Sequence, residues 1–397
     1  MIFENGSLLR VGETRQNPYI FAMNELAQYL EDNATRVAAL RAVTGFDGFV
    51  DEMVTLVNQR QDVEQFERVA TIADFGRRIS DSAGQSSLQE VVVTRQDAGG
   101  CAVNLGDALA DLSVQVETFA TVGEPVHAAF AAYQQKAHVT SWGSEPGRTI
   151  AFEFADGKCM FSAVSQLAKF TPEDLTRRLE DGCFEAACQG ADLIAFTDWT
   201  LYPHMTACWQ FLKSAILEKL GTRKPLFVDL VDPSSRNVTD IRAMLTTLTE
   251  LNTVCAVHLG LNQNEANQLD RILGHAPPQE LTRDFAGEQA QRLREALQLD
   301  AVVIHSRTYA AAAEKGATVA LDWEPFPQPV KSTGAGDRFN SGYTLGVMLN
   351  VSLESRLWLA CITTSLYVAR GRSATLPEVI AALRRLQGQH SAIIAAG

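Results

Sequence analysis

The sequence predicts an α/β protein built on a mainly parallel sheet with helices on both faces. The main evidence is an alternation of short apolar strands and helical segments from about residue 171 onward. We expect strands at 192–196, 227–231, 253–258 and 301–305, and helices at 205–220, 239–251, 264–273 and 289–297. Such alternation is typical of a parallel sheet covered on both sides. Because ligands of these sheets bind beyond the carboxyl ends of the strands, polar residues at those ends are the candidates for function.

Length and charge limit the organisation and the partners. The 397 residues are 46% hydrophobic, which allows a large core in one α/β unit with an appendage. The net charge of −13 argues against nucleic acid or an anionic membrane surface as the main partner. A phosphate-binding site would therefore be built locally, from backbone amides and a few cations.

Cysteine usage and the absence of apolar runs bear on the compartment. The chain has seven scattered cysteines with no C-x-x-C pair, which is typical of reduced, mostly buried thiols. It has neither an apolar run of membrane-spanning length nor a signal-peptide pattern. We expect a cytoplasmic protein without a membrane partner.

The N-terminal part leads into a first strand that ends in acidic residues. Residues 1–40 become helical from about 18 to 40, which predicts an accessory helix without chemistry. The apolar stretch 42–50 predicts a buried strand, and Asp47 and Asp51 lie four residues apart near its exit. Carboxylates there can accept hydrogen bonds from sugar hydroxyls. The alternative for either residue is a helix cap or an ion pair with a surface arginine.

The next segments predict an insertion, a glycine-opened helix and a hairpin. Residues 62–80 have near-helical spacing of apolar side chains and predict a helix inserted between strands. A strand is expected at 91–94, after which Gly99-Gly100 opens a helix with Asn104 on its first turn. Residues 147–154 and 158–161 predict two strands joined through Asp156-Gly157, a hairpin turn.

Two later strand ends also carry oxygen donors. Asp232 follows the strand at 227–231, within Asp232-Pro233-Ser234-Ser235-Arg236. Asn262 and Glu265 follow the next strand and begin a helix. For Glu265 the alternative interpretation is a carboxylate stabilised by the helix dipole.

The segment 330–343 carries the strongest functional signal in the chain. Phe339, Tyr343 and Val347 repeat every fourth residue, so Gly334-Ala335-Gly336 should lie at a helix N-terminus. Unpaired amides and the positive end of the helix dipole suit an anion there. Asp337 places a carboxylate beside that anion site, where it could take a proton from a hydroxyl that attacks phosphorus. The alternative is a glycine-rich turn whose Asp caps the helix.

Thr333-Gly334-Ala335-Gly336-Asp337, with Phe339 and Gly342, resembles the C-terminal signature of the ribokinase family, the PfkB-type carbohydrate kinases. The paired glycines with Asn104, the Asp-Pro-x-x-Arg at 232–236 and the Asn-x-x-Glu at 262–265 agree with that family in the expected order. The resemblance covers about residues 42–387. It implies a three-layer α/β/α ribokinase-like sandwich over 41–397, with a small β lid formed around 50–97 and 147–162, and it makes the lid a candidate homodimer interface.

The resemblance also implies a role for each candidate residue. Asp337 would be the general base, and the amides of Gly334, Ala335 and Gly336 would stabilise the charge on the transferred phosphoryl group. The sugar would be held by Asp51 (a better match to the family than Asp47), Gly99, Gly100 and Asn104. Thr333 and Arg307 would contact the nucleotide. Oxygens of Asn262, Glu265 and Asp232 would serve Mg²⁺, which prefers hard ligands and keeps several waters. The expected reaction is phosphorylation of a sugar hydroxyl by Mg-ATP.

Some positions depart from the family pattern. No glycine-rich turn follows the strand at 301–305, and Lys331-Ser332 stand where many members have Asp-Thr. Many ribokinase-like enzymes bind an activating monovalent cation near the position of Lys331, and a lysine ammonium could replace that ion. The pattern at 45–51 also resembles ADP-dependent sugar kinases. An ADP-dependent kinase and a non-catalytic sugar-binding sensor therefore remain alternatives.

Overall fold

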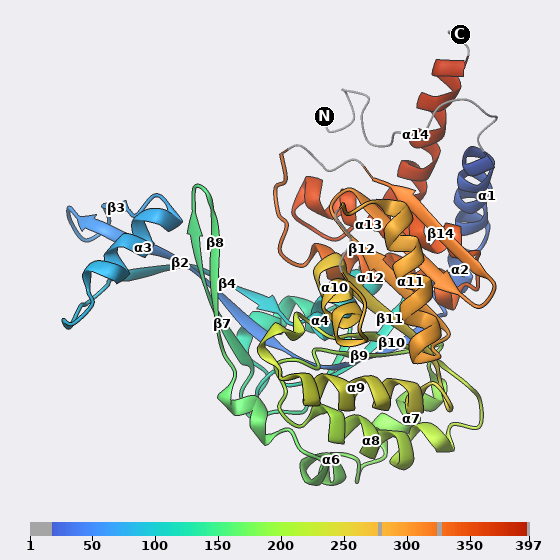
Figure 1. The fold of residues 1–397 in the computed structure, drawn as a ribbon, viewed down its shortest axis with the longest axis horizontal. Coiled ribbons are helices and arrows are strands. Elements are labelled where there is room, and N and C mark those ends of the chain that lie inside the picture. The colour runs from blue at the N-terminus through green and yellow to red at the C-terminus, as the bar shows by residue number, and fades with distance from the viewer. Residues whose placement is uncertain (1–17, 277–279, 324–327, 395–397) are drawn as a thin grey trace.

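The computed structural model describes residues 18–276, 280–323 and 328–394, and in this part a nine-stranded sheet lies between two layers of helices (Figure 1). The strand order is β14-β13-β12-β11-β10-β9-β1-β5-β6. Strands from β12 to β6 are parallel, and β13 and β14 add an antiparallel hairpin at one edge. In chain order the strands are β1 (Arg41–Phe46), β5 (Gln115–Ala120), β6 (His138–Ser141), β9 (Leu193–Thr197), β10 (Pro225–Asp229), β11 (Ala256–Asn262), β12 (Ala301–His305), β13 (Tyr309–Glu314) and β14 (Ala317–Asp322).

Each face of this sheet packs on its own set of helices. Buried side chains of one layer join a single apolar cluster with the sheet; its helices are α1 (Pro18–Asp32), α4 (Cys101–Asp111), α12 (Ala335–Met348), α13 (Leu353–Arg370) and α14 (Leu376–Ile394). The opposite cluster contains residues of α6 (Pro172–Arg178), α7 (Cys183–Gly190), α8 (Met205–Ala215), α9 (Val238–Leu251), α10 (Gln263–Ile272) and α11 (Arg283–Leu297). The predicted three-layer α/β/α class is confirmed.

A second, smaller sheet projects from the main body and forms the lid (Figure 1). In it β2 pairs antiparallel with β4 and parallel with β7, and β7 and β8 form the hairpin predicted at Asp156-Gly157. Its elements are β2 (Phe49–Arg60), β3 (Phe66–Arg68), α3 (Ile72–Asp81), β4 (Val91–Gly99), β7 (Gly147–Phe154) and β8 (Gly157–Ala163). Homodimerisation through this lid stays a prediction.

Three local predictions needed correction. Residues 62–80 do not form one helix: β3 pairs with β2, and α3 begins only after Thr71, whose hydroxyl accepts the Asp74 N–H at 3.1 Å. The strand expected at 253–258 is Ala256–Asn262, because residues just before it form the turn that ends α9. The helix expected over 18–40 is divided into α1 and α2 (Ala34–Val37), and Met23, Leu26 and Leu30 of α1 are buried in the core layer shared with α14. Among the described residues, no helix is both long and apolar enough to span a membrane.

Candidate active site

Asp337 lies at the N-terminus of α12, at the centre of the candidate site. Gly334 adopts a left-handed conformation with φ 78° and starts the helix, as the Gly334-Ala335-Gly336 segment predicted. The preceding turn is held by the Tyr367 hydroxyl, which donates to the Thr333 carbonyl at 2.6 Å. The Asp337 carboxylate is buried and accepts a hydrogen bond from Asn104 Nδ2 at 2.9 Å. Two motifs that lie 233 residues apart in the chain are therefore in direct contact.

Burial controls the charge of this carboxylate. Desolvation and, after it, the nearby Asp229 carboxyl raise the pKa of Asp337 to about 8, while Arg338 acts in the opposite direction. Arg338 points away from the carboxylate: its Nε donates to Ser373 Oγ at 3.2 Å, and its guanidinium lies 4.4 Å above the ring of Tyr367. A raised pKa near neutrality suits a general base.

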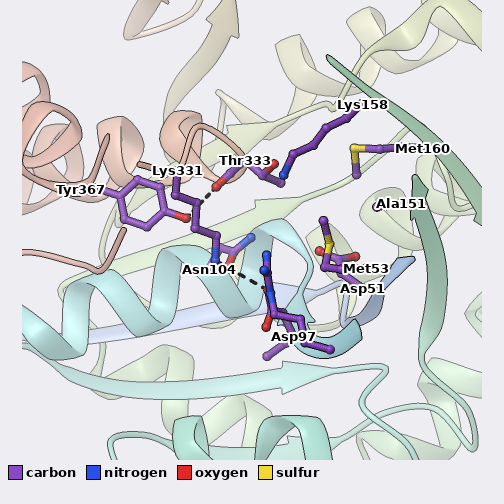
Figure 2. Close-up of a pocket in the computed structure, with 12 residues that line it drawn as sticks. Asp51, Met53, Asp97, Asn104, Ala151, Lys158, Met160, Lys331, Thr333 and Tyr367 are labelled. Atoms are coloured by element: carbon purple, nitrogen blue, oxygen red, sulfur yellow. Dashed lines mark hydrogen bonds and ion pairs between the residues drawn. The ribbon is translucent and has the colours of Figure 1, made fainter. Parts of the chain in front are cut away.

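Two cavities meet at the segment that leads into α12. The first, the lid cavity, lies between the lid and α4; its lining residues include Asp51, Asp97, Asn104, Lys158, Lys331 and Thr333 (Figure 2). The second, the large cavity, is much the roomier of the two; its lining residues include Asn262, Arg307, Ser332, Ala335, Gly336 and Phe339. Asp337 is not among the lining residues of either cavity, but Asn104 of the lid cavity donates to its carboxylate, and Gly336 of the large cavity precedes it in the chain.

The glycine pair makes room for the two acidic residues at the exit of β1 and the start of β2. A Cβ atom on Gly99 would lie 2.5 Å from Asp51 Oδ2, and one on Gly100 would lie 2.7 Å from the Asp47 carbonyl oxygen. Gly100 also has φ 99°, which other residues rarely adopt. Asp51 faces the lid cavity, and burial raises its pKa while Lys331 and Lys158 oppose that rise. Asp51 is therefore placed to meet a ligand in this cavity.

Asp47 is placed differently. Its buried carboxylate accepts the backbone N–H groups of Cys101 and Ala102, the latter at 2.9 Å, and the Thr197 hydroxyl at 2.6 Å. Both oxygens are thus engaged at the N-terminus of α4, the capping arrangement that the sequence left open as an alternative. This geometry favours a structural role for Asp47, because it holds the helix that carries Asn104.

Asn262 and Glu265 form a capping box at the start of α10. The Asn262 side chain accepts the Glu265 N–H at 3.0 Å, and Glu265 Oε2 accepts the Asn262 N–H at 2.8 Å. Burial raises the pKa of Glu265 to about 8, with a further contribution from Asp229. Asn262 lines the large cavity. Asp232 is not among the lining residues of that cavity, and its carboxylate accepts a hydrogen bond from Gln268 Nε2 at 2.9 Å. Within the described ranges no group of three or more His, Cys, Asp or Glu residues is arranged to hold a metal ion.

Comparison with known proteins decides the family. The sequence model described as prokaryotic ketohexokinase matches residues 22–386 of this chain. The chain belongs to the prokaryotic ketohexokinase family. The match begins within α1, earlier than the limit near residue 42 expected from the motifs.

Relatives of known name agree with this assignment. A ketohexokinase from Haloferax volcanii is 25% identical over 347 residues, which cover 87% of this chain and 91% of that protein. Phosphofructokinase-2 from Escherichia coli has a TM-score of 0.56 at 15% identity, covering 87% of this chain and 99% of that one. A Methanocaldococcus jannaschii nucleoside kinase, described as an archaeal member of the ribokinase family, has a TM-score of 0.54 at 13% identity, covering 87% and 98%.

Membership in the ketohexokinase family confirms that the chain is a ribokinase-like carbohydrate kinase, a phosphotransferase with an alcohol group as acceptor. The roles of individual residues stay predictions. Arg307 does line the large cavity, as a nucleotide contact should, but Thr333 lines the lid cavity.

Several site residues of this kinase escaped the sequence analysis. Asp97 lies directly opposite Asp51 in the β2–β4 pairing, so its position in Asp97-Ala98-Gly99-Gly100 was the available signal. Asp229, the last residue of β10, accepts from Asn340 Nδ2 at 2.7 Å, and its place at a strand end was a signal as well. Lys158 follows the predicted hairpin turn, and no local pattern marks it as part of the site.

Proposed function

We propose that this protein phosphorylates a hydroxyl group of a ketohexose with the γ-phosphoryl group of Mg-ATP, using Asp337 as the general base. The observation that carries the proposal is the position of the Asp337 carboxylate in the first turn of α12, where it contacts Asn104 of the lid cavity and follows Gly336 of the large cavity. The sugar would occupy the lid cavity against Asp51 and Asn104, and the nucleotide would occupy the large cavity. The ketohexose is suggested by the family and by the Haloferax relative.

In the proposed reaction the sugar hydroxyl oxygen attacks the γ-phosphorus, and the bond to the β,γ-bridging oxygen breaks. The hydroxyl proton passes to the Asp337 carboxylate. The amide of Gly336, at the positive end of the α12 dipole, stabilises the negative charge on the transferred group, whereas the Ala335 N–H already donates to the Ser332 carbonyl at 3.1 Å. Asn104 holds the Asp337 carboxylate in place through its hydrogen bond.

Mg²⁺ accompanying the nucleotide would be served by oxygens near the start of α10. The donor chemistry fits, because Asn262 lines the large cavity and Glu265 pairs with it in the capping box, and burial together with the Asp229 carboxyl raises the pKa of Glu265, which a bound cation would oppose. When bound, the ion would neutralise charge on the phosphates.

A substrate panel tests the proposal. Nucleotide turnover is measured by a coupled assay with ketohexoses, aldohexoses and nucleosides as acceptors, each with Mg-ATP and with Mg-ADP. Turnover with a ketohexose and Mg-ATP is the expected result. Turnover with Mg-ADP alone would identify an ADP-dependent kinase. Tight sugar binding without any turnover would favour the sensor alternative.

A further inference from the structure

The β7–β8 hairpin lines both cavities within a few residues. Asp156 and Gly157, at its turn, line the large cavity, whereas Lys158 and Met160, on β8, line the lid cavity. The segment that leads into α12 also lines both cavities, since Thr333 lines the lid cavity and its neighbour Ser332 the large cavity. The hairpin therefore lies at the boundary that a phosphoryl group crosses if the two substrates occupy the two cavities.

Lys158 is directed toward this boundary. Figure 2 shows its side chain extending from β8 toward Thr333. Its ammonium also makes an ion pair with Glu153 at 2.9 Å, in which both side chains keep about a third of their exposure, 33% and 36%. Partly exposed pairs of this kind contribute little to stability, so the ammonium can exchange Glu153 for a more highly charged partner at little cost.

Neighbouring cations of the lid cavity are already engaged by carboxylates or turned away. Arg95 donates to Asp97 at 2.8 Å, and Lys331 lies 4.0 Å from the same carboxylate and 5.9 Å from the centre of the Tyr367 ring. Arg338 follows Asp337 in the chain, yet its guanidinium contacts Asp107 and Ser373. Lys158 is itself paired with Glu153 at 2.9 Å, and what distinguishes it from the other lining cations is its place on the hairpin that lines both cavities.

The carboxyl groups around Asp337 would make a nearby positive charge favourable. Asp229 and Asp47 lie close enough to Asp337 to raise its pKa, so the site is rich in carboxyl groups. A transferred phosphoryl group brings further negative charge, and the helix N-terminus offers only about half a unit charge against it. A lysine that approaches from the lid would supply a full positive charge.

We propose that Lys158 contacts the transferred phosphoryl group and stabilises its charge in the transition state. This inference rests on the proposed function. The bonds change as described above: the sugar oxygen bonds to phosphorus, the bridging oxygen leaves and Asp337 receives the proton. Lys158 exchanges no atom and acts by charge and hydrogen bonding alone.

The inserted helix α3 holds the hairpin in this position. The Ile72 N–H donates to Asp156 Oδ1 at 2.9 Å, which fixes the hairpin turn to the start of α3. The ring of Phe75 stacks on Phe152 and Phe154 of β7, with ring centres 5.3 and 5.6 Å apart. These contacts of α3 therefore hold the β7–β8 hairpin, and with it Lys158, in place.

The test compares Lys158→Met, which keeps the length of the side chain, with Lys158→Arg and with Glu153→Gln as the matched control. Turnover is measured with D-fructose and Mg-ATP. Loss of a charge-assisted hydrogen bond should lower kcat about 10- to 100-fold in Lys158→Met, with both KM values within about threefold of wild type. Lys158→Arg should recover part of kcat, and Glu153→Gln should stay within about twofold of wild type, because only the Lys158 charge matters.

Calorimetry with Mg-ADP and aluminium fluoride, which together mimic the transferred group, supplies a reading that does not need a sugar. Lys158→Met should bind this mixture about 10-fold or more weakly than wild type, while its affinity for Mg-ADP alone is unchanged. Equal affinity for the mixture in both proteins would overturn the inference. So would an unchanged kcat with a raised KM for fructose, since Lys158 would then only position the sugar. If wild type phosphorylates no sugar, the proposed function fails, and the calorimetric comparison alone decides the role of Lys158.

Discussion

Replacing Asp337 by asparagine should remove most of the activity and stabilise the fold at neutral and alkaline pH. Without a general base the rate should fall about 10²- to 10⁴-fold, while nucleotide binding stays nearly intact. The stability effect has a separate cause. Burial raises the pKa of Asp337 to about 8 from its ordinary 3.8, so the folded protein is penalised when this carboxyl ionises.

The sign of the effect follows from proton binding. Between pH 4 and pH 8 the folded protein holds a proton on Asp337 that the unfolded chain has lost. The free energy of unfolding of the wild type therefore falls as pH rises through this window, and the contribution levels off above pH 8. At about 1.4 kcal/mol per pH unit, a window of about 4 units sets an upper limit of about 6 kcal/mol. Because the pKa of the Asp229 carboxyl is also raised, to about 6, and its charge acts on Asp337, the two titrations overlap, and we expect roughly 2 kcal/mol or more.

Urea unfolding at pH 5, 6.5, 8 and 9 measures this difference. Asp337→Asn should gain stability over wild type progressively up to about pH 8, and the asparagine oxygen can still accept the hydrogen bond from Asn104. Asp284→Asn is the control, because that carboxylate is 80% exposed and should give a difference that does not vary with pH in this way.

Two outcomes would refute the reasoning on separate points. Near-normal turnover of Asp337→Asn would show that Asp337 is not the base. A stability difference that is constant from pH 5 to pH 9 would show that burial does not raise the pKa of this carboxyl.

Two further predictions concern the lid cavity. Asp51→Ala should weaken sugar binding by about 1.5–3 kcal/mol and leave the affinity for nucleotide unchanged, because Asp51 lines this cavity with a partly buried carboxylate; identical sugar affinities by calorimetry would assign Asp51 to the scaffold. The enzyme should need no added potassium, because the Lys331 ammonium turns inward beside Asp97 and the Tyr367 ring and can take the place of a monovalent cation. Initial rates at equal ionic strength in potassium and tetramethylammonium salts test this, and strong activation by potassium alone would contradict it.

Local sequence determined much of the fold and the position of the anion site. Alternating strands and helices predicted the parallel sheet, because side-chain periodicity follows directly from backbone geometry. Gly334 marked the start of α12, since glycine tolerates the left-handed conformation observed there. The Asp156-Gly157 turn was equally local, and so was the choice of Asp337 as the carboxylate beside the amides.

Long-range packing decided the rest. The family resemblance favoured Asp51 over Asp47 without showing what Asp47 does; Asp47 meets the N-terminus of α4 more than 50 residues further along, while Asp51 faces the lid cavity. Asp337 lies in α12 and owes its raised pKa to burial and to Asp229, which lies far away in the chain at the end of β10. Lys158 and Thr333 lie far apart in the chain and line the same cavity only through the tertiary fold. Burial and electrostatic fields depend on which distant segments pack together, and a local pattern does not encode that, so these assignments came only from the tertiary structure.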